Sequence, residues 1–286
     1  MTSDVQVALV HDYLTQRGGA ERVVLSMLKA FPNAALHTSL YEKGSTFPEF
    51  SSTPVRTMAL DNVGVLRRNH RLAFPVLAAA FSRLVVEGDV ALCSSSGWAH
   101  GARVTGRKIV YCYSPARWLY QGNTYLGPDE RAARMALAVA RFPLLRWDRR
   151  MAATATRYLT LSNVVKERIF RAYGIVAEVL PPPPTLDPPG PSTARPGLAP
   201  GFFLCVSRLL PYKNVDAIVE AFSTMPDEQL VVVGEGPEGA RLARTATSNV
   251  TFGGVVDDAT LRWLYGNCAG LVAAGFEDFG LTLLEA

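Results

Sequence analysis

The chain has 286 residues, of which 49% are hydrophobic and 19% charged. This composition excludes an intrinsically disordered protein, and the length suits two domains with buried cores. Residues 1–180 contain 23 Lys and Arg against 13 Asp and Glu, a net charge of +10, whereas residues 181–286 contain 6 against 12, a net charge of −6. We therefore expect only the N-terminal part to face an anionic partner.

The lack of a recognisable targeting signal and the spacing of the cysteines predict a cytoplasmic protein. No apolar run approaches the unbroken length that spans a bilayer, and the N-terminus lacks the basic start and cleavage site of a signal peptide. The four cysteines are scattered, without a CxxC pair or a Cys/His cluster, and are expected to be reduced, buried thiols rather than metal ligands.

Short apolar runs alternate with amphipathic segments in residues 1–180, which predicts an α/β domain. The expected strands are residues 5–10, 36–40, 90–93, 108–113 and 158–161. Gly18 and Gly19 follow the first strand and precede a helix, as in a Rossmann-like unit, although the spaced-glycine dinucleotide fingerprint is absent. The glycine pair either admits a ligand close to the backbone or simply forms a tight turn.

Two stretches of the N-terminal half, residues 67–83 and 131–150, interleave arginines with apolar residues. Each is read either as a packed helix with a solvated basic edge or as an amphipathic segment lying on acidic lipid headgroups. Two such stretches in one domain favour the membrane surface as a partner. Nucleic acid is not expected, because no nucleic-acid-binding module is recognisable.

The proline-rich residues 181–200 predict a stiff linker, because proline lacks the amide donor and fixes φ. Residues 201–286 then predict a second α/β domain, with strands at residues 202–206, 230–233, 250–252 and 271–274. Asn214 is the expected N-cap of the helix after the first of these strands, and Asp257 or Asp258 that of the helix after the third.

Charged residues gather where the strands of this second domain end. Arg208 and Lys213 lie in the loop after its first strand, and Glu277 and Glu285 follow its last strand, on either side of Gly280. Ligands of an open α/β sheet bind at the carboxyl ends of its strands. We therefore expect the four side chains to converge on one cleft, where the cations hold a diphosphate and the carboxylates accept from hydroxyls. The alternative is that they are separate solvated surface charges.

Several motifs along nearly the whole chain together resemble one enzyme family. They are residues 207–214 (SRLLPYKN), 231–237 (VVVGEGP), 249–268 and 277–285 (EDFGLTLLE), with residues 11–24, 94–97, 111–120 (YCYSPARWLY) and 161–174 in the N-terminal half. The set resembles the family 4 glycosyltransferases, which have the GT-B architecture of two Rossmann-like domains. It looks most like the branch that builds bacterial surface polysaccharides, often with mannose.

The resemblance implies a retaining, metal-independent transfer from a nucleotide sugar, such as GDP-mannose or a UDP-sugar, to a lipid-linked or saccharide acceptor at the inner face of the plasma membrane. Arg208 and Lys213 match the pair that holds the donor diphosphate. Glu277 and Glu285 match the two glutamates of the E-x7-E motif, near the transferred sugar and the ribose. The other implied donor-binding positions are Gly18, Gly19, Gly234, Gly254, Gly280 and Leu281; Tyr113, Ser114 and Arg117 are on the acceptor and sugar side.

The sequence departs from the family pattern in two places. Many members have a histidine where this chain has Tyr113, whose hydroxyl is a poor base near neutral pH. The family also continues for further strands and helices beyond the position of Ala286, so we expect the second domain to be incomplete. The alternative function is therefore a truncated module that binds a nucleotide sugar without turnover. A dinucleotide-dependent oxidoreductase is a weaker alternative, because its glycine fingerprint is missing.

Overall fold

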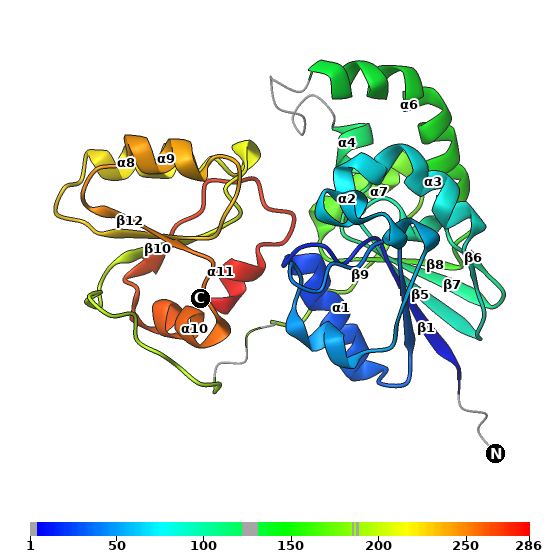
Figure 1. Ribbon diagram of the computed structural model, residues 1–286, viewed down its shortest axis with the longest axis horizontal. Coiled ribbons are helices and arrows are strands. Elements are labelled where there is room, and N and C mark those ends of the chain that lie inside the picture. The colour runs from blue at the N-terminus through cyan, green and yellow to red at the C-terminus, as the bar shows by residue number, and fades with distance from the viewer. Residues whose placement is uncertain (1–4, 122–130, 185, 187–188) are drawn as a thin grey trace. The chain divides into compact units, whose positions relative to one another are not determined.

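The chain folds into two compact units, residues 1–183 and 184–286 (Figure 1). The computed structural model describes residues 5–121, 131–184, 186 and 189–286, and the side chains of residues 71, 75 and 131–139 are also left undescribed. Both units are α/β with parallel sheets, the fold class that the sequence predicts. The division between the units falls within residues 181–200, where the sequence predicts a linker; Thr185, Asp187 and Pro188 of that segment lie outside the described residues.

The N-terminal unit is built on a seven-stranded sheet of order β3-β2-β1-β5-β7-β8-β9, in which neighbouring strands are parallel. The chain moves outward from β1 to β3 and then returns to the other side of β1, so the order reverses between β1 and β5. The strands are β1 (Val7–His11), β2 (Ala35–Thr38), β3 (Val55–Thr57), β5 (Val90–Ser95), β7 (Arg107–Cys112), β8 (Arg157–Thr160) and β9 (Glu178–Val179); β4 (Val85–Val86) and β6 (Arg103–Val104) form a separate parallel pair.

The helices of this unit follow the apolar patterns of the sequence. In α1, Val23, Val24 and Met27 are buried, with the spacing that places them on one face. Ser162 Oγ accepts from the backbone N–H of Val165 at the start of α7, and Gly174, at φ +70°, ends that helix. The helices are α1 (Gly19–Ala30), α2 (Gly64–Arg68), α3 (Phe74–Arg83), α4 (Arg117–Tyr120), α6 (Arg131–Ala152) and α7 (Asn163–Tyr173).

The C-terminal unit has a four-stranded parallel sheet of order β12-β11-β10-β13. Each face of the sheet carries its own apolar cluster, one that includes Ile218 and Phe222 of α8 and one that includes Leu261 and Leu264 of α10. The elements are β10 (Phe203–Val206), α8 (Val215–Ser223), β11 (Leu230–Val233), α9 (Gly239–Thr245), β12 (Val250–Gly254), α10 (Asp258–Asn267), β13 (Gly270–Leu271) and α11 (Leu281–Glu285).

Two elements of this unit differ from the sequence-based expectation. The strand predicted over residues 271–274 ends at Leu271, because the chain then leaves the sheet and Ala274 accepts a hydrogen bond from Asn214 instead. Asn214 is the N-cap residue of α8, as predicted, but its side chain makes no cap bond, and its backbone is in the left-handed region at φ +51°. The predicted cap at Asp257 is confirmed, since its Oδ1 accepts from the Thr260 N–H at 2.7 Å.

The proline-rich segment lies closer to the C-terminal unit than its composition indicates. Leu186 is buried in the cluster around α10. The Thr193 N–H donates to the Ala259 carbonyl, and Arg262 Nη1 donates to the Pro191 carbonyl at 3.0 Å. Residues without amide donors still have carbonyl acceptors and apolar surface, which is how this segment attaches to α10.

The described part of the chain contains four free cysteines. Cys93, Cys112 and Cys205 are buried and Cys268 is half-buried, in keeping with their predicted role as small apolar residues. Burial raises the pKa of Cys93 to about 12 and that of Cys205 to about 11, so both thiols stay protonated at neutral pH. Among the described residues, no helix combines the length and the apolar character needed to cross a membrane.

Candidate functional site

The candidate site of the C-terminal unit lies at the carboxyl ends of β10 and β13. These two strands are neighbours, and the sheet order reverses between them, since β11 and β12 lie on the other side of β10. In open α/β sheets, the loops on either side of such a reversal diverge and leave a crevice for a ligand. The two loops here are residues 207–214 and residues 272–280, which hold the charged residues singled out in the sequence.

Lys213 and Glu277 meet across this reversal. Lys213 Nζ lies 2.6 Å from Glu277 Oε1, a charge-assisted hydrogen bond between residues 64 positions apart. The side chains are 16% and 29% exposed, so the pair is half-buried and still reachable by a ligand. The structure thus brings these two predicted site residues into direct contact.

The two loops are held together by backbone contacts as well. Asn214 Nδ2 donates to the Ala274 carbonyl at 3.1 Å. Next to it, a Cβ on Gly275 would lie 3.3 Å from the Cα and the carbonyl oxygen of Lys213, so glycine permits this close approach. The left-handed conformation of Asn214, which asparagine tolerates better than most residues, directs its amide toward the second loop.

Arg208 lies on the same loop as Lys213 and has Tyr212 as a partner. Its Nη2 donates to the Tyr212 hydroxyl at 3.1 Å, and the Tyr212 ring centroid lies 5.5 Å from Lys213 Nζ. Tyr212 therefore stands between the two cations and orients both, through a hydrogen bond and a cation–π contact. The sequence analysis gave Tyr212 no role; its position four residues after Arg208 and one before Lys213 is the signal that was available.

The glycines predicted to approach the donor lie at the ends of β11 and β12. Gly234, at φ +127°, donates its N–H to the carbonyl of Gly254, and a Cβ on Gly234 would lie only 2.0 Å from the Ser207 carbonyl oxygen. This position therefore requires glycine to keep the β11 loop against the β10 loop. Gly280 is buried at φ +78° and is followed by Leu281, the first residue of α11.

Glu285, the second glutamate of the predicted pair, has a different neighbour. Its Oε2 accepts from the Tyr265 hydroxyl of α10 at 3.3 Å. The structure therefore joins Lys213 to Glu277, and Glu285 to α10. The proposed ribose-binding role of Glu285 stays a prediction.

In the N-terminal unit, the Gly18–Gly19 loop lies on a buried carboxylate that the sequence analysis did not single out. A Cβ on Gly18 would lie 2.6 Å from Glu21 Oε2, and Glu21 Oε1 accepts from Gln16 Nε2 and forms an ion pair with His11 Nε2 at 3.8 Å. Burial alone would lower the pKa of His11, but the hydrogen bond and charge of Glu21 outweigh it and raise that pKa. Burial opposes ionisation of Glu21 as well, yet His11 holds its pKa below the usual value.

Tyr113, predicted to lie on the sugar side, belongs to the same buried network. Its hydroxyl donates to the Ala20 carbonyl at 3.2 Å and lies 3.0 Å from Ser94 Oγ, which in turn is 2.9 Å from His11 Nδ1. Burial raises the pKa of Tyr113 well above 10, so the hydroxyl remains a donor. In this structure Tyr113 therefore supports the first turn of α1.

The other two residues predicted on that side are Ser114 and Arg117. Ser114 is buried, and its hydroxyl donates to the adjacent Pro115 carbonyl at 3.0 Å. Arg117 is half-buried and begins α4. Whether the acceptor contacts Tyr113, Ser114 or Arg117 stays a prediction.

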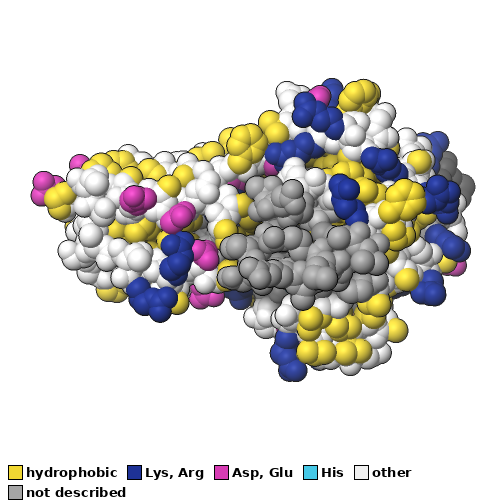
Figure 2. Space-filling view, turned by 90° about the horizontal axis from the view of Figure 1, so that it is seen from above, with side chains coloured by type: hydrophobic (Ala, Val, Ile, Leu, Met, Phe, Trp, Pro, Cys, Tyr) yellow, Lys and Arg dark blue, Asp and Glu magenta, His cyan; other side chains and the backbone are white. Residues whose placement is uncertain are grey.

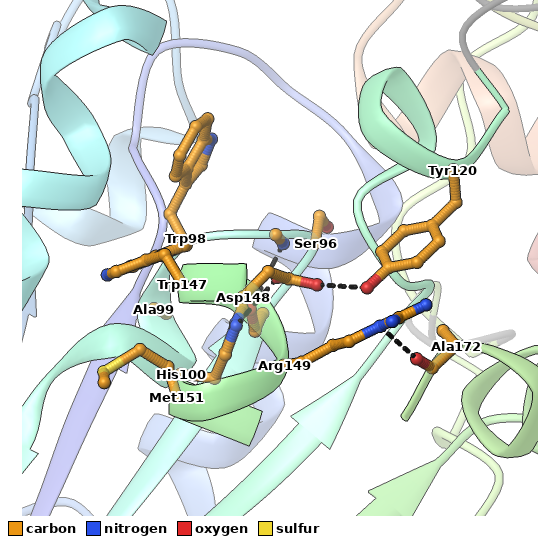
Figure 3. A network of polar contacts seen from close by, with 12 residues as sticks. Ser96, Trp98, Ala99, His100, Tyr120, Trp147, Asp148, Arg149, Met151 and Ala172 are labelled. Atoms are coloured by element: carbon orange, nitrogen blue, oxygen red, sulfur yellow. Dashed lines mark hydrogen bonds and ion pairs between the residues drawn. The ribbon is translucent and has the colours of Figure 1, made fainter. Parts of the chain in front are cut away.

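Asp12 follows β1, at the point between β1 and β5 where the strand order of the N-terminal sheet reverses. Its carboxylate accepts from the backbone N–H groups of Ser96, Trp98 and Ala99, at 2.6, 3.1 and 2.6 Å. A second buried carboxylate, Asp148 of α6, lies 3.0 Å from His100 Nε2 and accepts from the Tyr120 hydroxyl (Figure 3). Asp12 therefore holds the loop after β5 in place. Asp148 links α6 to His100 and to Tyr120 of α4.

No set of three or more His, Cys, Asp or Glu side chains among the described residues could hold a metal ion. The charged residues of the two loops at the β10–β13 reversal are the cations Arg208 and Lys213 and the carboxylates Glu277 and Asp278.

Solved structures with the same fold are two-domain proteins of the GT-B type. HepE from Anabaena, crystallised with UDP and glucose, is 18% identical, and the match covers 99% of this chain and 78% of HepE with a TM-score of 0.65. TarM is 9% identical, with coverage of 99% and 83% and a TM-score of 0.62. The catalytic domain of starch synthase IV from Arabidopsis thaliana, bound to ADP and acarbose, is 11% identical, with coverage of 99% and 81% and a TM-score of 0.54.

Sequence comparison finds a family match in the C-terminal unit. Residues 196–286 match the family model described as Glycosyl transferases group 1. No curated protein matches the sequence significantly. The matched residues include the whole Lys213–Glu277 site.

Proposed function

We propose that the chain is a family 4 glycosyltransferase that retains anomeric configuration. It moves a hexose, which we propose to be mannose, from a nucleotide sugar such as GDP-mannose or a UDP-sugar. The acceptor is a lipid-linked or growing saccharide of a cell-surface polysaccharide. The observation that carries the proposal is the contact between Lys213 and Glu277 at the sheet reversal of the unit that matches the group 1 model.

The chemistry of the site suits departure of a nucleoside diphosphate. Negative charge grows on the diphosphate as the sugar leaves, and Lys213 and Arg208 are the cations placed to stabilise it. When no donor is bound, Glu277 forms an ion pair with Lys213. When the donor diphosphate binds Lys213 instead, the Glu277 carboxylate can accept hydrogen bonds from the sugar hydroxyls. In this proposal Arg208 and Lys213 stabilise the negative charge of the leaving diphosphate without a metal ion.

The test is donor binding and sugar transfer by the purified chain and two variants. We expect Lys213→Met to weaken binding of the nucleoside diphosphate at least tenfold and to reduce transfer by ~10²-fold or more, since it removes charge stabilisation of the leaving group. Glu277→Gln keeps diphosphate binding within a few fold and reduces transfer by a similar factor. Calorimetry with GDP- and UDP-sugars measures binding, and the NMR coupling of the product's anomeric proton reports retention.

A matched control is Glu167→Gln, which removes the carboxylate of an exposed ion pair with Arg171 on α7. It should leave both quantities unchanged. Full transfer by Lys213→Met would overturn the proposed role of the site. Donor binding by the parent chain without transfer to any acceptor would identify the chain as the alternative, a binding module without turnover.

We also propose that the N-terminal unit binds peripherally to the acidic inner face of the plasma membrane. On α6, Phe142 is 77% exposed, and Arg141, Arg146, Arg149 and Arg150 are exposed around it. Figure 2 shows basic and hydrophobic side chains interspersed on a face of this unit, with few acidic ones among them. Apolar insertion combined with basic charge is the combination that attaches a protein to anionic lipid.

A further inference from the structure

A pocket in the N-terminal unit gathers positive charge. It has a volume of about 600 Å³, and its walls come from α3, the β6–β7 region and the C-terminal half of α6. The wall between the two helices is fixed, because Trp147 Nε1 of α6 donates to Ser82 Oγ of α3 at 2.7 Å. Its volume is within the range of sites that hold small ligands.

Four cations and no acidic residue line this pocket. The cations are Arg103, Lys108, Arg146 and Arg150. Among the described residues, none of the four takes part in an ion pair. Unpaired arginines in a concave site, with their planar donor groups, match the geometry of a phosphate.

Lys108 is the floor of the pocket and is buried. Its Nζ donates to the His100 carbonyl at 2.9 Å and to Thr154 Oγ1 at 2.7 Å, which are both neutral acceptors. Burial lowers the pKa of Lys108, and no carboxylate offsets that effect. A buried ammonium without a counter-charge is costly, and an anion in the pocket would remove the cost.

The pocket is separate from the candidate transferase site. Lys108 is the second residue of β7, and Gly106 and Thr154 precede β7 and β8, so the pocket lies at the amino ends of these strands. Tyr113 and Ser114 follow the carboxyl end of β7 and lie at the opposite edge of the sheet. None of the pocket residues belongs to the donor-binding set.

We propose that this pocket binds a phosphate ester, with Arg146, Arg150 and Lys108 holding the phosphate. The ligand is either a free phosphate ester or the headgroup of an anionic lipid. Arg146 and Arg150 also border a second hollow, of about 470 Å³, which Phe142 and Leu145 line with apolar surface. A phosphate with an apolar portion next to it therefore fits both hollows. This inference goes beyond the proposed transferase function and does not depend on it.

The test uses the full chain and the double variant Arg146→Gln/Arg150→Gln, in which both exchanged side chains are at the surface and the buried Lys108 is untouched. The control is Lys29→Gln/Arg56→Gln, which removes the same charge from α1 and β3 at exposed positions that neither line the pocket nor belong to the basic face of α6. Calorimetry with glycerol 1-phosphate measures the free ligand. Co-sedimentation with phosphatidylglycerol vesicles, against phosphatidylcholine vesicles, measures the lipid.

We expect saturable binding of one phosphate ligand that the double variant weakens at least tenfold and the control weakens less than threefold. If the difference appears with glycerol 1-phosphate alone, the ligand is a free ester; if it appears with phosphatidylglycerol vesicles, the ligand is a headgroup. Equal losses in the variant and the control, or no saturable binding of either probe, would overturn the proposal. Donor binding by both variants should equal that of the parent chain, which separates this result from the transferase test.

Discussion

Individual glycines set the shape of the loops at the carboxyl ends of the C-terminal strands, and Gly234 is the clearest case. It combines a positive φ with a carbonyl oxygen, that of Ser207, in the place where a Cβ would go. Gly201 also has a positive φ, +103°, but no atom lies within 4 Å of its Cβ position. Alanine substitutions at Gly234 and Gly201 therefore separate the effect of backbone strain from that of a steric clash.

We expect Gly234→Ala to lower the free energy of unfolding by more than ~2 kcal/mol, because the clash is with backbone and must displace the β10 or β11 loop. Gly201→Ala should cost only the strain of a left-handed alanine, ~1 kcal/mol. Urea unfolding followed by circular dichroism measures both. Equal losses of unfolding free energy in the two variants would contradict the prediction, because they would show that the loop after β11 moves to accommodate the Cβ at no cost.

Residue roles were predictable from the sequence where they depend on a motif and not where they depend on how the side chains are oriented in the folded chain. Lys213 and Glu277 were singled out because each lies in a charged loop after a strand. Tyr212 and Glu21 were missed, since only the folded chain reveals that one lies between two cations and the other beneath Gly18. Asn214 is at the predicted N-cap position of α8, but the sequence could not show that its side chain donates to Ala274, 60 positions away, instead of capping the helix.

At the scale of elements, the strands were predictable because buried parallel strands are continuous apolar runs. β11, with all four residues buried, matches its predicted bounds of residues 230–233. β13 is shorter than predicted, since residues 273 and 274 are exposed and leave the sheet to meet the loop after β10. An apolar run alone does not reveal where tertiary contacts end a strand.

The junction of β1 and α1 depends on the ion pair between His11 and Glu21. The folded pKa of His11 is above its unfolded value near 6.5, so its contribution is complete below pH 6.5 and is lost as the pH rises through the folded value. The folded pKa of Glu21 is below its unfolded value near 4.5, so its contribution is present above pH 4.5 and is lost as the pH falls through the folded value. The pair therefore stabilises the unit most between these two pH values.

We expect the difference in unfolding free energy between the parent chain and Glu21→Gln to be largest near pH 5.5 and to shrink above pH 6.5, in chemical denaturation from pH 4 to 9. Asp12 also lies close to His11 but is present in both proteins, so its effect cancels. The control is Glu178→Gln, which removes an exposed ion pair with Arg157 and should show no such pH profile. A pH-independent difference for Glu21→Gln would contradict this account.

On the scale of the whole molecule, charge divides unevenly between the two units, and the exposed apolar residues of α6 lie on the basic one. Binding to anionic vesicles should therefore need both charge and Phe142. We expect phosphatidylglycerol vesicles to bind the chain and phosphatidylcholine vesicles not to, with affinity falling as salt rises, because exposed charges are screened beyond ~10 Å at 0.1 M ionic strength.

We expect Phe142→Ser to weaken this binding by about tenfold, the scale of one apolar side chain removed from contact with lipid. Phe31→Ser is the control, since Phe31 is an exposed phenylalanine at the C-terminal end of α1. Vesicle flotation at two salt concentrations measures both. Equal weakening by the two variants, or equal binding to both lipids, would argue against a membrane face at α6.

The hydrogen bond from Asn214 to Ala274 and the contact of Gly275 with Lys213 fasten two segments that lie 60 positions apart. Because their shapes are interdependent, neither segment can be exchanged by itself for the equivalent piece of another enzyme. Any redesign of the ligand preference of this site would have to transplant residues 207–214 and 272–280 together.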